Sequence, residues 1–159
     1  MRVGILTVST KGARGERADT SGAAIRELLA PLGATVVHYQ IVPDDRATIA
    51  RLLRAWADDG QVDLILTTGG TGLAPTDVTP EATREVIERE VPGLAEVMRL
   101  ATWSQSPRAV LSRAVAGTRG RTLIVNLPGS PRGVRECLGV ILPVLPHAVD
   151  ILQGRGDHA

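Results

Sequence analysis

The sequence predicts an α/β fold in which a parallel sheet carries helices on its faces. Three short segments rich in β-branched residues alternate with two segments of helical periodicity, giving the order strand, helix, strand, helix, strand. The first and third of these strands are apolar at consecutive positions, as in strands that are covered on both faces. Because no repeat, linker or low-complexity tract divides the 159 residues, we expect one domain over 1–159.

The first half of the chain supplies clear boundaries for its elements. Apolar residues recur at helical spacing before Gly33 and again before Gly60, and glycine commonly follows the end of a helix. An aspartate after Pro43 is a suitable N-cap for the second helix. The predicted order is a strand at 2–8, a helix at 21–33, a strand at 34–42, a helix from Asp44 or Asp45 to Gly60, and a strand at 62–68.

The second half begins with Thr79-Pro80-Glu81, which combines a cap, a proline at the first helical position and an acid in the first turn. The predicted elements are a helix from Thr79 to about Glu90, a helix at 92–103, two strands within 108–127 joined near Gly117 to Gly120, and a last helical region at 128–154 interrupted by Pro143 and Pro146. Trp103, near the end of the second of these helices, is expected in either the core or an interface.

Composition excludes several classes of partner. A net charge of +1, with only three aromatic side chains able to stack on bases, argues against nucleic-acid binding. The apolar runs are too short to cross a membrane. One cysteine, Cys137, forms no internal disulfide, and no N-terminal apolar segment precedes a cleavage site, so a cytoplasmic location is expected.

Other reactive side chains lack a pattern that indicates chemistry. Cys137 lies on an apolar helical face and is expected in the core. The histidines are too scattered for metal ligation: His38, His147 and His158. Three arginines of the second half are expected as surface charges, one or two of which could meet a substrate phosphate: Arg113, Arg132 and Arg135.

Unusual residues gather where the predicted strands end. Gly69, Gly70, Thr71 and Gly72 follow the third strand, where ligands of parallel sheets bind. Glycines let backbone amides approach an anion, and threonine hydroxyls can add hydrogen bonds. Since neither the P-loop nor the G-x-G-x-x-G pattern is present, this loop is either a phosphate cradle or a tight structural turn.

Two aspartates follow other strand ends and suggest a cation site. Asp44 follows the second strand, and Asp77 lies beyond the glycine loop, so the fold can bring both carboxylates to one pocket. Mg²⁺ bound to phosphates takes one or two protein carboxylates and keeps several waters. The alternatives are a plain helix N-cap for Asp44 and a turn for Asp77, whose side chain would bond its own backbone.

Four segments together resemble the MogA/MoaB family of molybdenum cofactor biosynthesis proteins, which includes the G domains of Cnx1 and gephyrin. They are VPDD at 42–45, TTGGTGLAPTDVTPEAT at 67–83, AVLSRAVAG at 109–117 and LIVNLPGSPRGVRECL at 123–138. The resemblance covers nearly the whole chain. It implies a three-layer α/β/α sandwich with a mostly parallel sheet and an enzyme that adenylylates molybdopterin with Mg-ATP, releasing pyrophosphate.

The resemblance also implies roles for individual residues. Asp44 and Asp77 match the two essential acids, which would be catalytic and would hold Mg²⁺. The residues that match substrate-binding positions are Gly69, Gly70, Thr71, Gly72, Ser112, Asn126, Pro128, Gly129 and Ser130, with Ser112 and Asn126 at the pterin. The family further implies a homotrimer, or a hexamer, and a metal-insertion protein of the same pathway as the partner that follows.

One departure and three alternatives qualify the expected activity. Family members commonly have an acid directly after the serine of the first loop, whereas this chain has Thr10 and Lys11 there. Asp19-Thr20-Ser21-Gly22 retains the family's D-x-S-G pattern. The alternatives are a MoaB-type protein that binds molybdopterin with little catalysis, a scaffold or assembly module of the same fold, and another nucleotide-handling member of the superfamily.

Overall fold

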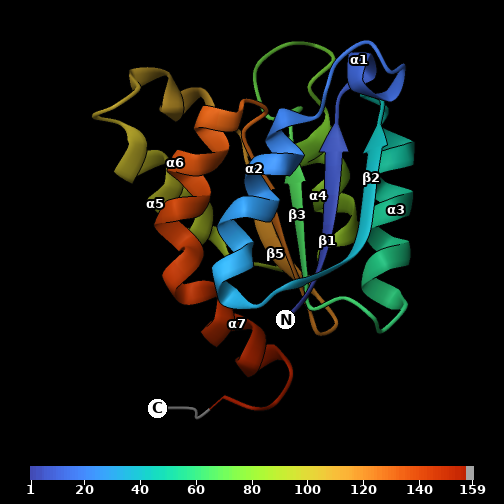
Figure 1. Cartoon of the computed structure of the whole chain (residues 1–159), viewed down its shortest axis with the longest axis vertical. Coiled ribbons are helices and arrows are strands. Elements are labelled where there is room, and N and C mark those ends of the chain that lie inside the picture. Colours follow the sequence, from blue (N-terminus) through green and yellow to red (C-terminus); the bar gives the residue numbers. More distant parts are fainter. Residues whose placement is uncertain (157–159) are drawn as a thin grey trace.

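The computed structural model describes residues 1–156, and every helix in that range packs on or beside one six-stranded sheet (Figure 1). The strand order is β2-β1-β3-β6-β5-β4, with β1 parallel to both β2 and β3, and β3 parallel to β6. Strands β5 and β4 are antiparallel additions at one edge. The bounds are β1 Arg2–Val8, β2 Thr35–Val42, β3 Leu64–Thr68, β4 Arg89–Glu90, β5 Ala116–Arg119 and β6 Thr122–Leu127.

Helices cover both faces of this sheet, which confirms the three-layer α/β/α prediction. One face packs against α2, α5, α6 and α7, and the other against α3 and α4. The α-helices are α1 Thr10–Ala13, α2 Thr20–Leu29, α3 Arg46–Asp58, α4 Thr79–Val86, α5 Pro92–Thr102, α6 Pro131–Ile141 and α7 Leu145–Leu152. Three short 3₁₀ segments are η1 Ala30–Leu32, η2 Pro107–Leu111 and η3 Leu142–Val144.

The side chains of β1 show how the sequence separates the two layers. Val3 and Ile5 enter the core beneath α2 and α6, whereas Leu6 and Val8 enter the core beneath α3. Gly4 leaves room for Trp56 of α3, since an added Cβ would lie 2.9 Å from the indole. Full burial on both faces follows directly from the consecutive apolar positions of this strand.

Four sequence expectations are corrected by the structure. The helix that starts at Thr79 ends at Val86 rather than near Glu90, because Arg89–Glu90 pairs with β5. The segment around 107–111 is the 3₁₀ helix η2, so no strand begins at 108. The turn between β5 and β6 lies at Gly120, and Gly117 is within β5. The loop after β1 contains the short helix α1.

Some side chains differ from their expected environments. Trp103 is 51% exposed, so it is not a core residue. Cys137 packs against the core but is only partly buried. His158 lies outside the described residues. No helix among residues 1–156 is long and apolar enough to span a membrane.

Candidate functional site

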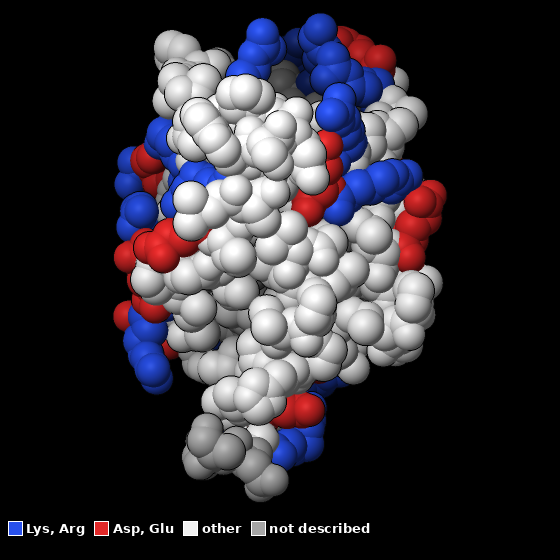
Figure 2. All heavy atoms as spheres, turned by 90° about the vertical axis from the view of Figure 1, so that its left-hand side faces the viewer, with Lys and Arg blue, Asp and Glu red and all other residues white. Residues whose placement is uncertain are grey.

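Two neighbouring cavities lie near the carboxyl ends of the parallel strands, and those of β1, β2 and β3 point to the upper end of Figure 1. The larger is lined by the ends of β1 and β3 and by the segments that follow β2 and β6, and the smaller by α5, η2, the end of β6 and α6. The larger has a volume of about 750 Å³ and the smaller about 270 Å³. Figure 2 keeps the same vertical axis and shows Lys and Arg side chains gathered at this upper end. The cations that line the cavities are Lys11 and Arg17 in the larger, and Arg99, Arg108 and Arg132 in the smaller.

The larger cavity brings together the two predicted acids. Asp44 and Asp77 both line it, with Gly69 and Gly70 of the glycine loop. Gly70 adjoins Asp44, because an added Cβ would lie 3.4 Å from Asp44 Oδ1. The carboxyl-end rule for parallel sheets therefore located this group of residues correctly.

Asp44 is held by the first loop and does not cap the following helix. The Thr10 hydroxyl donates to Asp44 Oδ2 at 3.0 Å and accepts from the Asp44 N–H at 3.1 Å. Asp45 is the N-cap of α3, accepting from Thr48 N at 2.9 Å. Of the two aspartates proposed as caps, Asp45 takes that role and Asp44 is left facing the cavity.

Asp77 combines a turn with exposure to the cavity. Its Oδ2 accepts from Ala74 N at 3.0 Å, and its own N–H donates to Ala74 O at 2.9 Å. Gly72 leaves space for this carboxylate, since an added Cβ would lie 2.9 Å from Asp77 Oδ2. The predicted turn is therefore present and uses one carboxylate oxygen of Asp77, while the residue also lines the cavity.

A cation fits the donor set that these two residues present. Among the hydrogen bonds of residues 1–156, each carboxylate accepts through Oδ2, so Oδ1 of Asp44 and Oδ1 of Asp77 are available. Two carboxylates that line one cavity provide the hard oxygen ligands that Mg²⁺ takes. Neither here nor elsewhere among residues 1–156 do three His, Cys, Asp or Glu side chains gather as a metal-binding group, so a cation at this site would take only these two carboxylates from the protein.

The glycine loop is a tight crossing of backbone segments. Gly69 and Gly70 have φ values of 99° and 69°, a region that favours glycine. A Cβ on Gly69 would lie 2.3 Å from Val8 O, and one on Gly70 would lie 2.3 Å from Thr79 Oγ1. The structural-turn alternative therefore accounts for both glycines, which also border the larger cavity.

The threonine hydroxyls near this loop bond to protein groups. Thr68 Oγ1 donates to Pro128 O at 2.6 Å, and Thr79 Oγ1 donates to Gly69 O at 2.9 Å. The Thr68 hydroxyl therefore fixes the loop, whereas the threonine hydroxyls of this loop were expected to bond to a phosphate. The expectation that Thr79 caps the next helix is wrong, because Val78 is the N-cap of α4 and Thr79 is its first residue. Thr71 is buried, and neither Thr71 nor Gly72 lines either of the two cavities.

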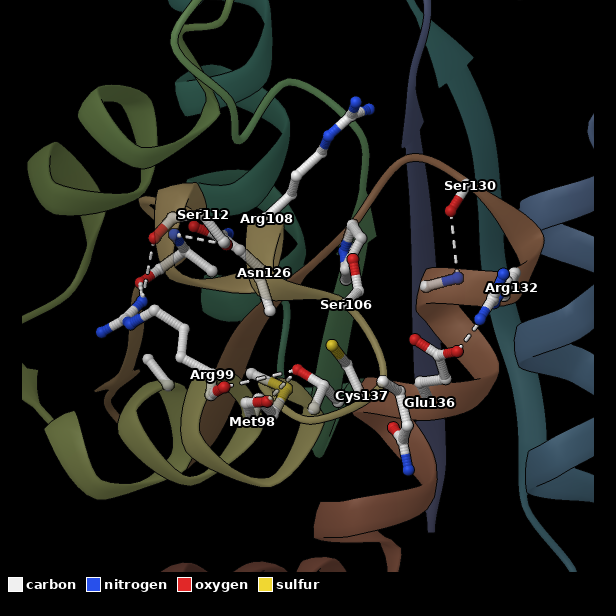
Figure 3. A pocket seen from close by; sticks show the side chains of 17 residues that line it. Met98, Arg99, Ser106, Arg108, Ser112, Asn126, Ser130, Arg132, Glu136 and Cys137 are labelled. Carbon is white, nitrogen blue, oxygen red and sulfur yellow. Dashed lines mark hydrogen bonds and ion pairs between the residues drawn. The ribbon is translucent and has the colours of Figure 1, made fainter.

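The smaller cavity contains four predicted substrate-binding residues: Ser112, Asn126, Pro128 and Ser130 (Figure 3). Ser130 also lines the larger cavity, so the two cavities adjoin at the start of α6. Gly129 borders only the larger one of this pair. Cys137 lines the smaller cavity, and burial raises the pKa of its thiol.

Asn126 is the centre of a buried network. Its Oδ1 accepts from Val115 N at 3.0 Å, and its Nδ2 donates to Thr67 Oγ1 at 3.0 Å and to Thr83 Oγ1 at 2.9 Å. Both amide hydrogens are therefore used within the protein. The side chain can offer a ligand in the smaller cavity only the second lone pair of Oδ1.

The D-x-S-G segment builds one wall of the larger cavity. Asp19 caps α2 through Gly22 N and also accepts from Thr7 Oγ1 at 2.7 Å and from the Tyr39 hydroxyl. Burial and the hydrogen bond to Asp19 raise the pKa of Tyr39 to about 12. Ser21 Oγ donates to Gly129 O at 2.6 Å, which joins this segment to the loop after β6.

Sequence reasoning missed several residues of the site. Lys11 and Arg17 line the larger cavity from the first loop, where their charge was the available signal. Of the three arginines that were expected at the surface, with one or two able to meet a phosphate, Arg132 lines the smaller cavity and pairs with Glu136, while Arg135 is a surface charge paired with Glu27. Arg113 is partly buried and bonds to the loop that carries Asp77.

Comparison with known proteins identifies the family. Residues 4–147 match the model of a probable molybdopterin binding domain. A molybdopterin adenylyltransferase of Helicobacter pylori strain J99 is 43% identical over 97% of this chain and 89% of its own length.

Solved structures agree with this match. The molybdopterin biosynthesis enzyme MoaB of Thermus thermophilus has a TM-score of 0.92 and 62% identity, covering 98% of each chain. The tungsten cofactor synthesizing protein MoaB of Pyrococcus furiosus has a TM-score of 0.85 and 36% identity, covering 98% of this chain and 97% of its own. This chain belongs to the family of molybdopterin-binding domains.

Proposed function

We propose that this chain is a molybdopterin adenylyltransferase, with ATP in the larger cavity and molybdopterin in the smaller one. The observation that carries the proposal is the shared wall at Ser130, which sets a cavity lined by two acids beside a second cavity. Relatives named molybdopterin adenylyltransferase, including that of Escherichia coli at 36% identity over 97% of this chain, support the activity.

The reaction joins two anionic groups. An oxygen of the terminal phosphate of molybdopterin attacks the α-phosphorus of ATP, and the bond from that phosphorus to the bridging oxygen breaks. Pyrophosphate leaves with the bonding electrons and its charge. The attacking oxygen is already deprotonated at neutral pH, so the site requires no general base, and positioning and charge stabilisation supply the catalysis.

The residues of the larger cavity suit this task. Asp44 and Asp77 would hold Mg²⁺, which when bound offsets the charge of the phosphates. Lys11 and Arg17 add two positive charges to the same wall. Gly70 lies at this wall and its backbone N–H can donate to the nucleotide, whereas the Gly69 N–H donates to Leu127 O at 3.2 Å.

The smaller cavity suits a polar ring system that bears a phosphate. Ser112 and the Asn126 amide oxygen offer hydrogen bonds, while Arg99, Arg108 and Arg132 provide positive charge. A ligand that reaches from this cavity past Ser130 brings its end to the nucleotide.

Product analysis tests the proposed activity. Purified protein is incubated with Mg-ATP and molybdopterin, and pyrophosphate release and the mass of adenylylated pterin are measured. We expect one pyrophosphate for each adenylylated molybdopterin. Release without an adenylylated pterin, or no turnover at all, would contradict the proposal.

A MoaB-type binding protein is the second candidate function. The Thermus thermophilus protein whose solved structure is named MoaB is 62% identical to this chain. Thr10 stands where the resemblance implies an acid that would contact the nucleotide. Binding of molybdopterin with no transfer from ATP would identify that function, or the scaffold role.

Three further expectations stay predictions: the homotrimer or hexamer, the metal-insertion partner and the cytoplasmic location. Light scattering checks the first of them by measuring the mass of the protein in solution.

A further inference from the structure

Arg113 bonds to the protein at four points around the loop that carries Asp77. Its Nε donates to Gly72 O at 2.8 Å, and its Nη2 donates to Asp77 O at 2.8 Å. Its Nη1 donates to Glu81 Oε2 at 2.7 Å, and its backbone N–H donates to Thr71 O at 2.9 Å. One side chain thus connects both ends of the loop 72–77 with the first turn of α4.

This connection restrains a loop that is otherwise exposed. Residues 73–76 are exposed, and Leu73 reaches 65%. A free loop of this length samples many conformations, and fixing both of its ends removes most of them. The carboxylate of Asp77 takes its place at the larger cavity from this loop, so its position depends on the two carbonyl contacts of Arg113.

The residue before Arg113 belongs to the other cavity. Ser112 lines the smaller cavity, and Arg99, in the same wall, donates to Ser112 O at 3.3 Å and to Ala114 O at 3.2 Å. Arg113 lines neither of the two cavities itself. It therefore contacts no occupant directly, and its effect on the site passes through the backbone on either side.

We propose that Arg113 is a positioning residue that fixes the Asp77 carboxylate and, through Ser112, makes the loop 72–77 respond to a ligand in the smaller cavity. This inference rests on the proposed function, in which molybdopterin occupies that cavity and Asp77 serves the nucleotide. A ligand that binds to Ser112 restricts the motion of the adjoining Arg113. The guanidinium of Arg113 in turn restricts the motion of the loop 72–77.

The guanidinium is suited to this task in a way that an ammonium is not. Arginine presents five donors in a planar fork, and here the fork meets two carbonyls and one carboxylate. Lysine places one compact charge at the end of a flexible stem and cannot span these three acceptors at once. Arg113→Lys should therefore retain part of the effect and Arg113→Gln almost none.

Hydrogen exchange tests the proposal independently of catalysis. Amide exchange of residues 72–77 is measured for the full chain with and without molybdopterin alone. In the wild type we expect molybdopterin to slow exchange in this loop by about tenfold, and in Arg113→Gln to leave it unchanged. Turnover with Mg-ATP should fall by about tenfold or more in Arg113→Gln, while the Kd for molybdopterin stays within about twofold.

Arg119→Gln is the matched control. Arg119 also bonds to a carboxylate, Asp58, and to a carbonyl, Val86 O, but it lies at the opposite end of β6. The proposal is overturned if molybdopterin slows loop exchange equally in wild type and Arg113→Gln, or if Arg119→Gln gives the same change. If Arg113→Gln does not fold, Arg113→Lys is used in its place. We then expect molybdopterin to slow loop exchange less than in the wild type, and an equal slowing would contradict the proposal. Absence of adenylylated product from the wild type would refute the proposed function. The exchange measurement would still test the positioning role of Arg113, because it requires no turnover.

Discussion

Thr10 and Asp44 form a reciprocal pair, in which the Thr10 hydroxyl donates to Asp44 Oδ2 at 3.0 Å and accepts from the backbone N–H of Asp44 at 3.1 Å. The family resemblance leads to the expectation of an acid at the position of Thr10. With a neutral hydroxyl in place of an acid, the wall of the larger cavity carries one negative charge fewer. The hydroxyl also orients Asp44 without like-charge repulsion.

Thr10→Asp should make stability depend on magnesium. A second carboxylate beside Asp44 introduces like-charge repulsion, so we expect the metal-free protein to lose about 1 kcal/mol of unfolding free energy. Added Mg²⁺ should restore more stability to this variant than to the wild type. Thermal unfolding with and without Mg²⁺ measures both effects, and Thr10→Ser, which keeps the hydroxyl, is the control. An identical Mg²⁺ response in all three proteins would contradict the pairing.

Asp77→Asn should lower turnover at least about 10²-fold, a loss of about 2.7 kcal/mol of transition-state stabilisation. The amide oxygen can still accept from Ala74 N, so the turn and the fold should persist. Steady-state adenylylation and thermal unfolding measure the two properties. Asp45→Asn is the control, because asparagine also caps helices and Asp45 lines neither of the two cavities. Wild-type turnover by Asp77→Asn would refute the assigned role.

Gly69→Ala should destabilise the protein by more than about 2 kcal/mol. The φ value of 99° is unfavourable for alanine, and the new methyl would lie 2.3 Å from Val8 O, a backbone atom that cannot turn aside. Gly15→Ala separates the two causes, because its φ is 74° but no atom lies within 4 Å of the added Cβ. Urea unfolding should show a loss of only about 1 kcal/mol for that control. Equal losses would mean that the close approach contributes nothing.

Asp63→Asn should reduce stability at neutral pH and leave it unchanged in acid. Burial favours the neutral acid, but hydrogen bonds from Arg2 at 2.7 and 2.9 Å outweigh it, so the pKa of Asp63 is lowered. The folded state then binds this proton less readily than the unfolded state. The stabilisation is complete above the ordinary pKa and is lost as pH falls through the lowered one.

Urea unfolding of both proteins at about pH 7 and about pH 2 measures this difference, which we expect to be about 1 to 2 kcal/mol at the higher pH. Arg2 is 42% exposed, which keeps the value below that of a fully buried pair. A difference that is the same at both pH values would show that the ion pair is not its cause.

The parallel part of the fold was predictable because a strand that is buried on both faces has apolar residues at consecutive positions of the sequence. Residues 3–8 and 64–68 are buried throughout and carry only threonine among their apolar residues, and α3 carries an apolar stripe before Gly60. Strand β4 has no such pattern. It consists of Arg89 and Glu90, and only its pairing with a strand some thirty residues later makes it a strand.

The candidate site divides in the same way. Asp44 and Asp77 were predicted to share a cavity because strand topology dictates where their loops meet, and both line one. The contacts of Arg113 were not predictable, since its three acceptors come from separate positions that converge only in the folded chain. Asn126 was expected to contact substrate, but its network with Thr67 and Thr83 is invisible in sequence.

Because Ser130 belongs to the walls of both cavities, the reaction product is expected to occupy both cavities at once, which affects how fast it is released. A molecule made by linking the two occupants keeps the contacts of both, and releasing one end leaves the other end tethered close by. Rebinding of the free end then competes with escape. Of all the species on the reaction path, the joined product should have the longest residence time.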